Sequence, residues 1–241
     1  MTTIIVIPAR MAAIRLPNKP LAIIGGKPMV IRVAEQAKKA GIGRVLIACD
    51  GPEIYGVAKD YGYDAVITSP DLTSGTDRVF ASLGDLVSSF NCIINLQGDM
   101  PLIDPEVIIK THECFRNHAY CDIVTAVAKI HQESDFHNPS VVKAIVAEPS
   151  GRALYFTRSP CPSGGIENGY KHIGIYAYRP KSLRRFVSLP PSPLEKSEKL
   201  EQLRAMEDGM SIVTAVVRHY PISVDTADDL ELARRSCQAQ S

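Results

Sequence analysis

The chain has 241 residues, of which 45% are hydrophobic and 22% charged. These values are typical of a globular protein, and a chain of this length buries a substantial core. Lysine and arginine number 27 against 26 aspartates and glutamates. The resulting charge of +1 gives no long-range electrostatic reason to bind nucleic acid or an anionic membrane. No apolar run approaches the roughly 18 to 20 residues of a membrane span, and no basic leader precedes the first strand. We therefore expect a cytoplasmic protein without membrane insertion and without a nucleic-acid partner.

The first half of the chain alternates short β-rich runs with helical patterns. Nearly continuous apolar runs predict strands that are buried on both faces of a parallel sheet. The predicted strands are 3–7, 44–49, 65–68 and 92–96, and the predicted helices are 28–40, 52–61 and 76–89. This βαβ order predicts an α/β fold with a doubly wound, mostly parallel sheet.

The regular alternation stops in the second half. Helices are predicted at 105–118, 181–187, 197–208 and 227–237, and strands at 122–128, 172–178 and 211–217. The runs 141–147 and 153–158 predict a hairpin around the turn Glu148-Pro149-Ser150-Gly151, and residues 159–169 predict a loop. We expect one domain over 1–241, with a smaller strand-rich cap or dimerisation section at approximately 122–190.

Three cations follow the first predicted strand. Arg10, Arg15 and Lys19 lie within ten residues, in a loop that a doubly wound sheet places in its ligand crevice. Such a cluster suits a polyphosphate, although a solvated basic loop would have the same spacing. Neither a G-x-x-x-x-G-K-[ST] loop nor a G-x-G-x-x-G turn is present, so side chains would have to hold the phosphates.

Two carboxylates follow apolar runs far apart in the chain. Asp99 comes directly after the strand predicted at 92–96, at the same sheet edge as the basic loop. Asp225 comes after a short apolar run and directly before a helix. Converging carboxylates could bind Mg²⁺, but each could equally be a turn residue or a helix cap.

Ten sequence blocks, in the same order, resemble the 3-deoxy-manno-octulosonate (Kdo) cytidylyltransferases, also called CMP-Kdo synthetases. The first five are Ile7-Pro8-Ala9-Arg10, Arg15-Leu16-Pro17-Asn18-Lys19-Pro20-Leu21, Gly26-Lys27-Pro28-Met29, Ser74-Gly75-Thr76-Asp77-Arg78 and Gln97-Gly98-Asp99-Met100-Pro101. The others are Ala153-Leu154-Tyr155-Phe156-Thr157-Arg158, His172-Ile173-Gly174-Ile175-Tyr176, Ser192-Pro193-Leu194-Glu195, Leu200-Glu201-Gln202-Leu203-Arg204 and Val224-Asp225-Thr226. They extend over nearly the whole chain. The first block alone is shared by many nucleotidyltransferases, whereas the later blocks favour Kdo as the sugar.

The resemblance implies a fold similar to nucleotide-diphospho-sugar transferases and a role for each matched block. Arg10, Arg15 and Lys19 would hold the CTP phosphates and contribute to catalysis, and Asp99 and Asp225 would hold Mg²⁺. Ala9, Ser74, Gly75 and Gln97 would help to seat the nucleotide. The implied sugar-binding residues are Arg78, Tyr155, Arg158, His172, Tyr176, Glu201 and Gln202, most of them in or near the section 122–190.

The implied reaction transfers a cytidylyl group from CTP to the anomeric hydroxyl of Kdo. It gives CMP-Kdo, for lipopolysaccharide biosynthesis, and pyrophosphate. The family resemblance also implies a homodimer.

Several positions depart from the family pattern. The family usually carries small hydroxyl residues at Ala13 and Ile14, an acidic residue at Met100, and a longer aromatic-bearing stretch around 159–169. These departures leave two alternatives open. One is a cytidylyltransferase for a related acid sugar, an amino-Kdo or a nonulosonate, and the other is a catalytically weak nucleotide-binding relative.

Overall fold

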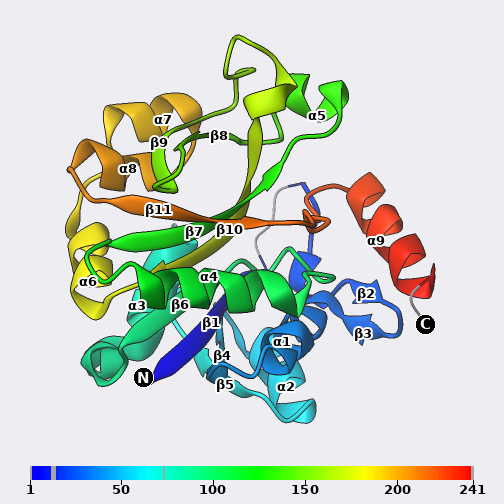
Figure 1. The fold of residues 1–241 in the computed structure, drawn as a ribbon. Helices are drawn as coiled ribbons and strands as arrows, with labels where there is room; N and C mark the ends of the chain where they lie inside the picture. Colours follow the sequence, from blue (N-terminus) through cyan, green and yellow to red (C-terminus); the bar gives the residue numbers. More distant parts are fainter. Residues whose placement is uncertain (1, 12–14, 73, 240–241) are drawn as a thin grey trace. The chain divides into compact units, whose positions relative to one another are not determined.

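The computed structural model describes residues 2–11, 15–72 and 74–239 (Figure 1). The chain divides into two compact units. Unit 1 contains residues 1–108 and 221–241, and unit 2 contains residues 109–220. The chain therefore completes unit 2 before it returns to unit 1.

Unit 1 is built on a parallel sheet with the strand order β5-β4-β1-β6. These strands are β1 Thr3–Ala9, β4 Arg44–Cys49, β5 Asp64–Ile67 and β6 Cys92–Leu96. Every residue of β1 and β6 is buried, as expected for central strands of a parallel sheet. The four strands predicted from the first half of the sequence are therefore present, and they are parallel as predicted.

Helices follow the strands of unit 1 in βαβ order. They are α1 Met29–Lys39, α2 Pro52–Asp60 and α3 Gly75–Leu83. The sequence prediction of one helix over 76–89 was wrong at its end. Gly84 adopts a left-handed φ of 49° and ends α3, and the chain continues as a 3₁₀ helix over Gly84–Ser89.

A small two-stranded hairpin and the last helix form a second core in unit 1. The hairpin, β2 Ile23–Ile24 and β3 Lys27–Pro28, was not predicted, and it turns at two glycines with positive φ, Gly25 and Gly26. Helix α9 spans Ala227–Ala239. The buried cluster that joins these elements consists of Ile24, Met29, Val224, Leu230, Ala233 and Cys237. The C-terminal segment is thereby packed into unit 1.

Unit 2 contains five strands, and the first and last strands in their order also pair with each other. The strands are β7 Ile123–Lys129, β8 Lys143–Ala147, β9 Arg152–Thr157, β10 Tyr170–Tyr178 and β11 Ile212–Val217. The order β10-β7-β11-β9-β8 is completed by pairing between β8 and β10. Only β7 and β11 are parallel among these pairs. The strand-rich section predicted at 122–190 lies within this unit.

The helices of unit 2 are short, apart from the helix at its start. Helix α4, Pro105–Asn117, runs from unit 1 into unit 2. The others are α5 Glu133–His137, which was not predicted, α6 Pro180–Ser188, α7 Pro193–Glu198 and α8 Gln202–Glu207. The single helix predicted over 197–208 was wrong, because a capping box at Ser192 starts α7 and Lys199 ends it with a left-handed φ of 55°. Among the helices of the described residues, none is both long and apolar enough to cross a bilayer.

Candidate active site

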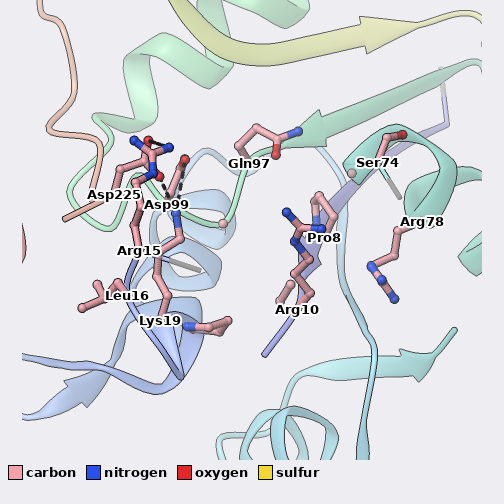
Figure 2. Close-up of a pocket in the computed structure, with 14 residues that line it drawn as sticks. Pro8, Arg10, Arg15, Leu16, Lys19, Ser74, Arg78, Gln97, Asp99 and Asp225 are labelled. Carbon is pink, nitrogen blue, oxygen red and sulfur yellow. Dashed lines mark hydrogen bonds and ion pairs between the residues drawn. The ribbon is translucent and has the colours of Figure 1, made fainter. Parts of the chain in front are cut away.

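A cavity of about 380 Å³ lies in unit 1, at the carboxyl ends of its parallel strands (Figure 2). This volume falls within the range of small-molecule sites. The charged lining side chains are Arg10, Arg15, Lys19, Arg78, Asp99 and Asp225. The cations outnumber the carboxylates, so the cavity favours an anionic ligand. Three predicted elements therefore meet here: the basic loop and both carboxylates.

Lys19 connects the two carboxylates. Its Nζ lies 2.9 Å from Asp225 Oδ1 and 3.7 Å from Asp99 Oδ2, and it donates to the Val224 carbonyl at 2.9 Å. Arg15 Nη2 lies 3.4 Å from Asp225 Oδ2 (Figure 2). Because one ammonium reaches both carboxylates, Asp99 and Asp225 converge on the same small volume although 126 positions separate them in the sequence.

The environment of Asp99 makes its charged form less favourable than in water. Burial raises the pKa of the Asp99 carboxyl, and the nearby charge of Asp225 raises it further. Lys19 acts in the opposite direction and lowers that pKa. A second cation between the two carboxylates would relieve the remaining repulsion.

The donor set agrees with a magnesium site. Two carboxylates converge, and Mg²⁺ usually takes one or two carboxylates and completes its shell with water and substrate phosphate. Within the described residues, no group of three or more His, Cys, Asp or Glu side chains could hold a metal ion by itself. The pocket residues therefore suit a metal that arrives with a phosphate ligand better than a closed structural metal site.

Ser74, Gly75 and Gln97 also line the cavity, and Ser74 lies on the side away from Asp99 and Asp225 (Figure 2). Ser74 Oγ accepts the Asp77 amide at 3.0 Å and begins α3. Gln97 Nε2 donates to Asn95 Oδ1 at 3.0 Å, which fixes the orientation of the Gln97 amide. Gly75 leaves little room beside it, because a Cβ there would lie 3.1 Å from the Gln97 amide atoms.

Arg78, predicted as a sugar-binding residue, lines this same cavity in unit 1. Arg78 is only 2% exposed, and its guanidinium donates to Thr68 Oγ1 at 2.5 Å and to the Ser69 carbonyl at 3.2 Å. Burial lowers the pKa of Arg78. In this structure Arg78 thus supports the segment after β5 and contributes positive charge to the cavity wall.

Asp50 is a neighbour of the cavity that the sequence argument overlooked. Both of its carboxylate oxygens accept the Met11 backbone N–H, at 3.1 and 3.0 Å. It thereby anchors the chain immediately after Arg10. The signal was available, since Asp50 follows the strand 44–49 directly, at the same sheet edge as Asp99. Ala13 and Ile14 lie outside the described residues.

Six of the predicted sugar-binding residues lie in unit 2, where four of them form one group. The His172 ring lies 5.5 Å from the Tyr176 ring, and Tyr176 Oη donates to Gln202 Oε1 at 3.2 Å. The charge of Glu201, the neighbour of Gln202, contributes to the raised pKa of Tyr176, after the larger effect of burial. Gln202 is 4% exposed, and its Nε2 makes no hydrogen bond among the described residues. This amide nitrogen is therefore a buried donor without a partner among the described residues.

Tyr155 and Arg158 lie on or beside β9, and both contact Glu198. Glu198 Oε2 accepts the Arg158 backbone N–H at 2.9 Å, and a hydrogen bond to Glu198 contributes to the raised pKa of Tyr155, after burial. The Arg158 guanidinium donates to the carbonyls of Glu198 and Pro139, each at 2.9 Å. Glu198 was not among the predicted site residues, because its place on a predicted helix suggested a side chain that faces solvent.

Comparison with known proteins identifies the family. A family model described as cytidylyltransferase matches residues 4–212. A 3-deoxy-manno-octulosonate cytidylyltransferase from Nitrobacter hamburgensis is 52% identical over 238 residues, which cover 97% of this chain and 92% of the relative. The chain belongs to the Kdo cytidylyltransferase family. Another Kdo cytidylyltransferase, from Brucella anthropi, is 48% identical over 238 residues, or 96% of this chain and 95% of the relative.

Solved structures agree with this membership in the Kdo cytidylyltransferase family. A CMP:2-keto-3-deoxy-manno-octonic acid synthetase complexed with CTP is 36% identical, with a TM-score of 0.93 and full coverage of both chains. A putative glucose-1-phosphate thymidylyltransferase from Bacillus anthracis is 16% identical with a TM-score of 0.70, over 98% of this chain and 96% of that one. The second likeness concerns the fold alone, which mixes strands and helices.

Met100 is a departure that the structure accounts for. Kdo cytidylyltransferases usually carry an acidic residue at this position, but here the side chain is 3% exposed and does not line the cavity. A buried apolar side chain at this position suits methionine, which fills irregular space. Methionine in place of an acidic residue at position 100 therefore does not take a carboxylate away from the cavity wall, because Met100 is not among the residues that line it.

Proposed function

We propose that this protein transfers the cytidylyl group of CTP to the anomeric hydroxyl of Kdo. The oxygen of that hydroxyl forms a bond to the α-phosphorus, the bond from the α-phosphorus to the bridging oxygen breaks, and pyrophosphate leaves with that oxygen. The hydroxyl proton passes to solvent. The product, CMP-Kdo, would serve lipopolysaccharide biosynthesis. The observation that carries the proposal is the meeting of Arg10, Arg15, Lys19, Asp99 and Asp225 in one cavity, in a chain about half identical to proteins named for this reaction.

The basic residues would bind the triphosphate and neutralise the leaving pyrophosphate. Arg10 and Arg15 are exposed, so their guanidinium groups can turn toward phosphate oxygens without losing buried contacts. Charge-assisted hydrogen bonds of this kind contribute roughly 1.5 to 3 kcal/mol each. Lys19 is held nearer to the carboxylates and would meet the phosphate that lies closest to them.

We assign Asp99 and Asp225 as the residues that would hold Mg²⁺. When bound, the ion would supply Lewis-acid polarisation of the α-phosphate and would stabilise the ionised form of the attacking hydroxyl. Both carboxylates lie within 3.7 Å of the Lys19 ammonium, which supports the proposal that they share one cation.

Nucleotide and sugar selection would rest on different residues. Ala9, Ser74, Gly75 and Gln97 line the same cavity and would seat the nucleoside. The predicted sugar-binding residues are Tyr155, Arg158, His172, Tyr176, Glu201 and Gln202 in unit 2 and Arg78 in unit 1, with the buried Gln202 amide nitrogen as a donor to a sugar hydroxyl. The predictions of a homodimer and of a cytoplasmic location stay predictions, and light scattering on the purified protein would test the first.

The proposal is tested by pyrophosphate release from CTP with Kdo and Mg²⁺, with a metal-free reaction as control. Release that requires both Kdo and the metal supports the assignment. Turnover with a nonulosonate or an amino-Kdo but not with Kdo would move the protein to a related sugar, and CTP binding without any turnover would indicate an inactive nucleotide binder.

Substitution of each carboxylate tests the residue roles. Asp99→Asn and Asp225→Asn should each lower kcat by about 100-fold or more, because an amide is a poor Mg²⁺ ligand. Asp60→Asn, at an exposed position at the end of α2, is the matched control. Near-normal turnover in either active-site variant would remove that carboxylate from the metal assignment.

A further inference from the structure

The carboxylate of Asp229 holds the chain at Asp225. It lies in the first turn of α9, and its Oδ2 accepts the Asp225 N–H at 3.1 Å and the Thr226 N–H at 2.9 Å. Thr226 Oγ1 donates to the same oxygen at 2.8 Å and accepts the Asp229 N–H at 3.2 Å. Asp229 and Thr226 thus form a reciprocal cap that includes the backbone N–H of Asp225.

The residues before Asp225 are held by the catalytic cavity itself. The Val224 N–H donates to the Asp99 carbonyl at 2.8 Å, and the Val224 carbonyl accepts from Lys19 Nζ. Val224 is fully buried in the core that joins α9 to the hairpin β2–β3. The segment is therefore fixed before Asp225 by contacts with Asp99 and Lys19, and after it by Asp229.

Asp225 depends on these backbone contacts more than Asp99 does. The Asp225 side chain is 44% exposed, against 26% for Asp99. A side chain with this much exposure is not oriented by close packing, so the position of its carboxylate depends on its backbone and on its ion pairs with Lys19 and Arg15. In Figure 2, Asp225 lies beside Asp99 with Arg15 and Lys19 reaching it. The cap at Asp229 fixes the backbone on which this arrangement depends.

We propose that Asp229 is a positioning residue for the reaction: it holds Asp225 so that the Asp225 carboxylate faces Asp99, ready to share a divalent cation. The inference rests on the proposed function, in which Asp99 and Asp225 hold that cation. Asp229 acts mainly through its hydrogen-bond acceptors. Outer residues that orient a metal ligand commonly change metal affinity by about 10- to 100-fold.

The experiment compares Asp229→Ala and Asp229→Asn with Asp228→Ala. Asp228 is the matched control, since it is an exposed carboxylate one position earlier on the same helix. The first readout is Mn²⁺ binding to the protein with CTP, measured by electron paramagnetic resonance, and the second is turnover as a function of Mg²⁺ concentration.

Asp229→Ala should weaken Mn²⁺ binding by about 10-fold or more. Excess Mg²⁺ should restore its turnover, because the chemistry of the bound state is retained. Asp229→Asn keeps an acceptor oxygen and should stay within about 3-fold of the unaltered protein, and Asp228→Ala should bind Mn²⁺ normally. If Asp229→Ala lost activity through a structural defect elsewhere, excess Mg²⁺ would not restore its turnover.

Two outcomes would overturn the inference, and they are distinguishable from each other. If Asp225→Asn abolishes Mn²⁺ binding but Asp229→Ala behaves like Asp228→Ala, the positioning role is wrong and the proposed function stands. If Asp225→Asn also leaves Mn²⁺ binding unchanged, the metal assignment itself fails. Should Asp229→Ala not fold, Asp229→Glu is the second test, because it keeps the charge but displaces the acceptors, and unaltered Mn²⁺ affinity in that variant would also contradict the inference.

Discussion

His172 should make the folded protein less stable in mild acid. Its imidazole is 7% exposed, packs edge-on against Phe156 at 5.0 Å, and lies 2.8 Å from Thr125 Oγ1 through Nε2. Burial lowers the pKa of His172 to about 3, whereas the unfolded chain would protonate near the ordinary value of 6.5. Between these two values the unfolded state binds the extra proton, so the stability of the fold falls as the pH falls.

The size of this effect follows from the two pKa values. Between pH 7 and pH 5 the unfolded state gains about 2 kcal/mol from protonation of this one side chain, while the folded state gains almost nothing. The contribution grows further on acidification until the pH reaches about 3, below which both states are protonated. A loss of 2 kcal/mol is large beside the roughly 5 to 15 kcal/mol of a typical protein.

His172→Gln isolates this contribution, because its amide can still reach Thr125 but does not titrate. Urea unfolding at pH 7 and pH 5 should show a loss of stability that is about 2 kcal/mol smaller in the variant than in the unaltered protein. His131→Gln, at an exposed position, is the control for the substitution itself. Equal pH dependence of His172→Gln and the unaltered protein would refute the reasoning, since His172 would then protonate equally in both states.

Two further predictions concern space and charge. Gly75→Ala places a Cβ 3.1 Å from the Gln97 amide, and we expect roughly 5-fold weaker CTP binding by calorimetry, from about 1 kcal/mol of overpacking. Gly56→Ala, where a Cβ meets nothing within 4 Å, should bind CTP normally, and equal binding by both variants would contradict the argument. Arg204→Met should lower the free energy of unfolding by about 3 kcal/mol, because it leaves the Glu195 carboxylate, whose side chain is 14% exposed, without its bidentate partner. Adding Glu195→Met should recover most of that loss, and a single-variant loss below about 1 kcal/mol would show that water already screens the pair.

The first half of the fold was predictable because its signals are local. Buried parallel strands appear as apolar runs, and the strands predicted at 44–49 and 92–96 match the observed bounds. The errors occur where a single backbone angle decides the outcome. Gly84 and Lys199 both adopt positive φ and break predicted helices, and for Lys199 the residue type gives no warning.

The candidate site was predictable in its members but not in its contacts. Asp99 was expected at a sheet edge from its place after a strand, whereas its meeting with Asp225 depends on tertiary packing across the whole length of the chain. The protein contacts of Arg78 and Arg158 could not be predicted from the sequence. Their guanidinium groups donate to protein oxygens in the structure, and their role in sugar binding stays a prediction. A sequence pattern can therefore identify a charged residue, but it does not identify the groups with which that residue forms hydrogen bonds or ion pairs.

The return of residues 221–241 to unit 1 has a consequence for the order in which a newly made chain acquires activity. On the ribosome, Arg10, Lys19 and Asp99 emerge early, but Asp225 follows only after all of unit 2 has been synthesised. At a synthesis rate of about 5 to 20 residues per second, the synthesis of unit 2 delays Asp225 by on the order of 6 to 22 s. During this time the nascent cavity has basic side chains and one carboxylate but lacks the second carboxylate, and the hairpin β2–β3 lacks the helix that buries Ile24. An interrupted chain could therefore attract nucleotide without being able to consume it.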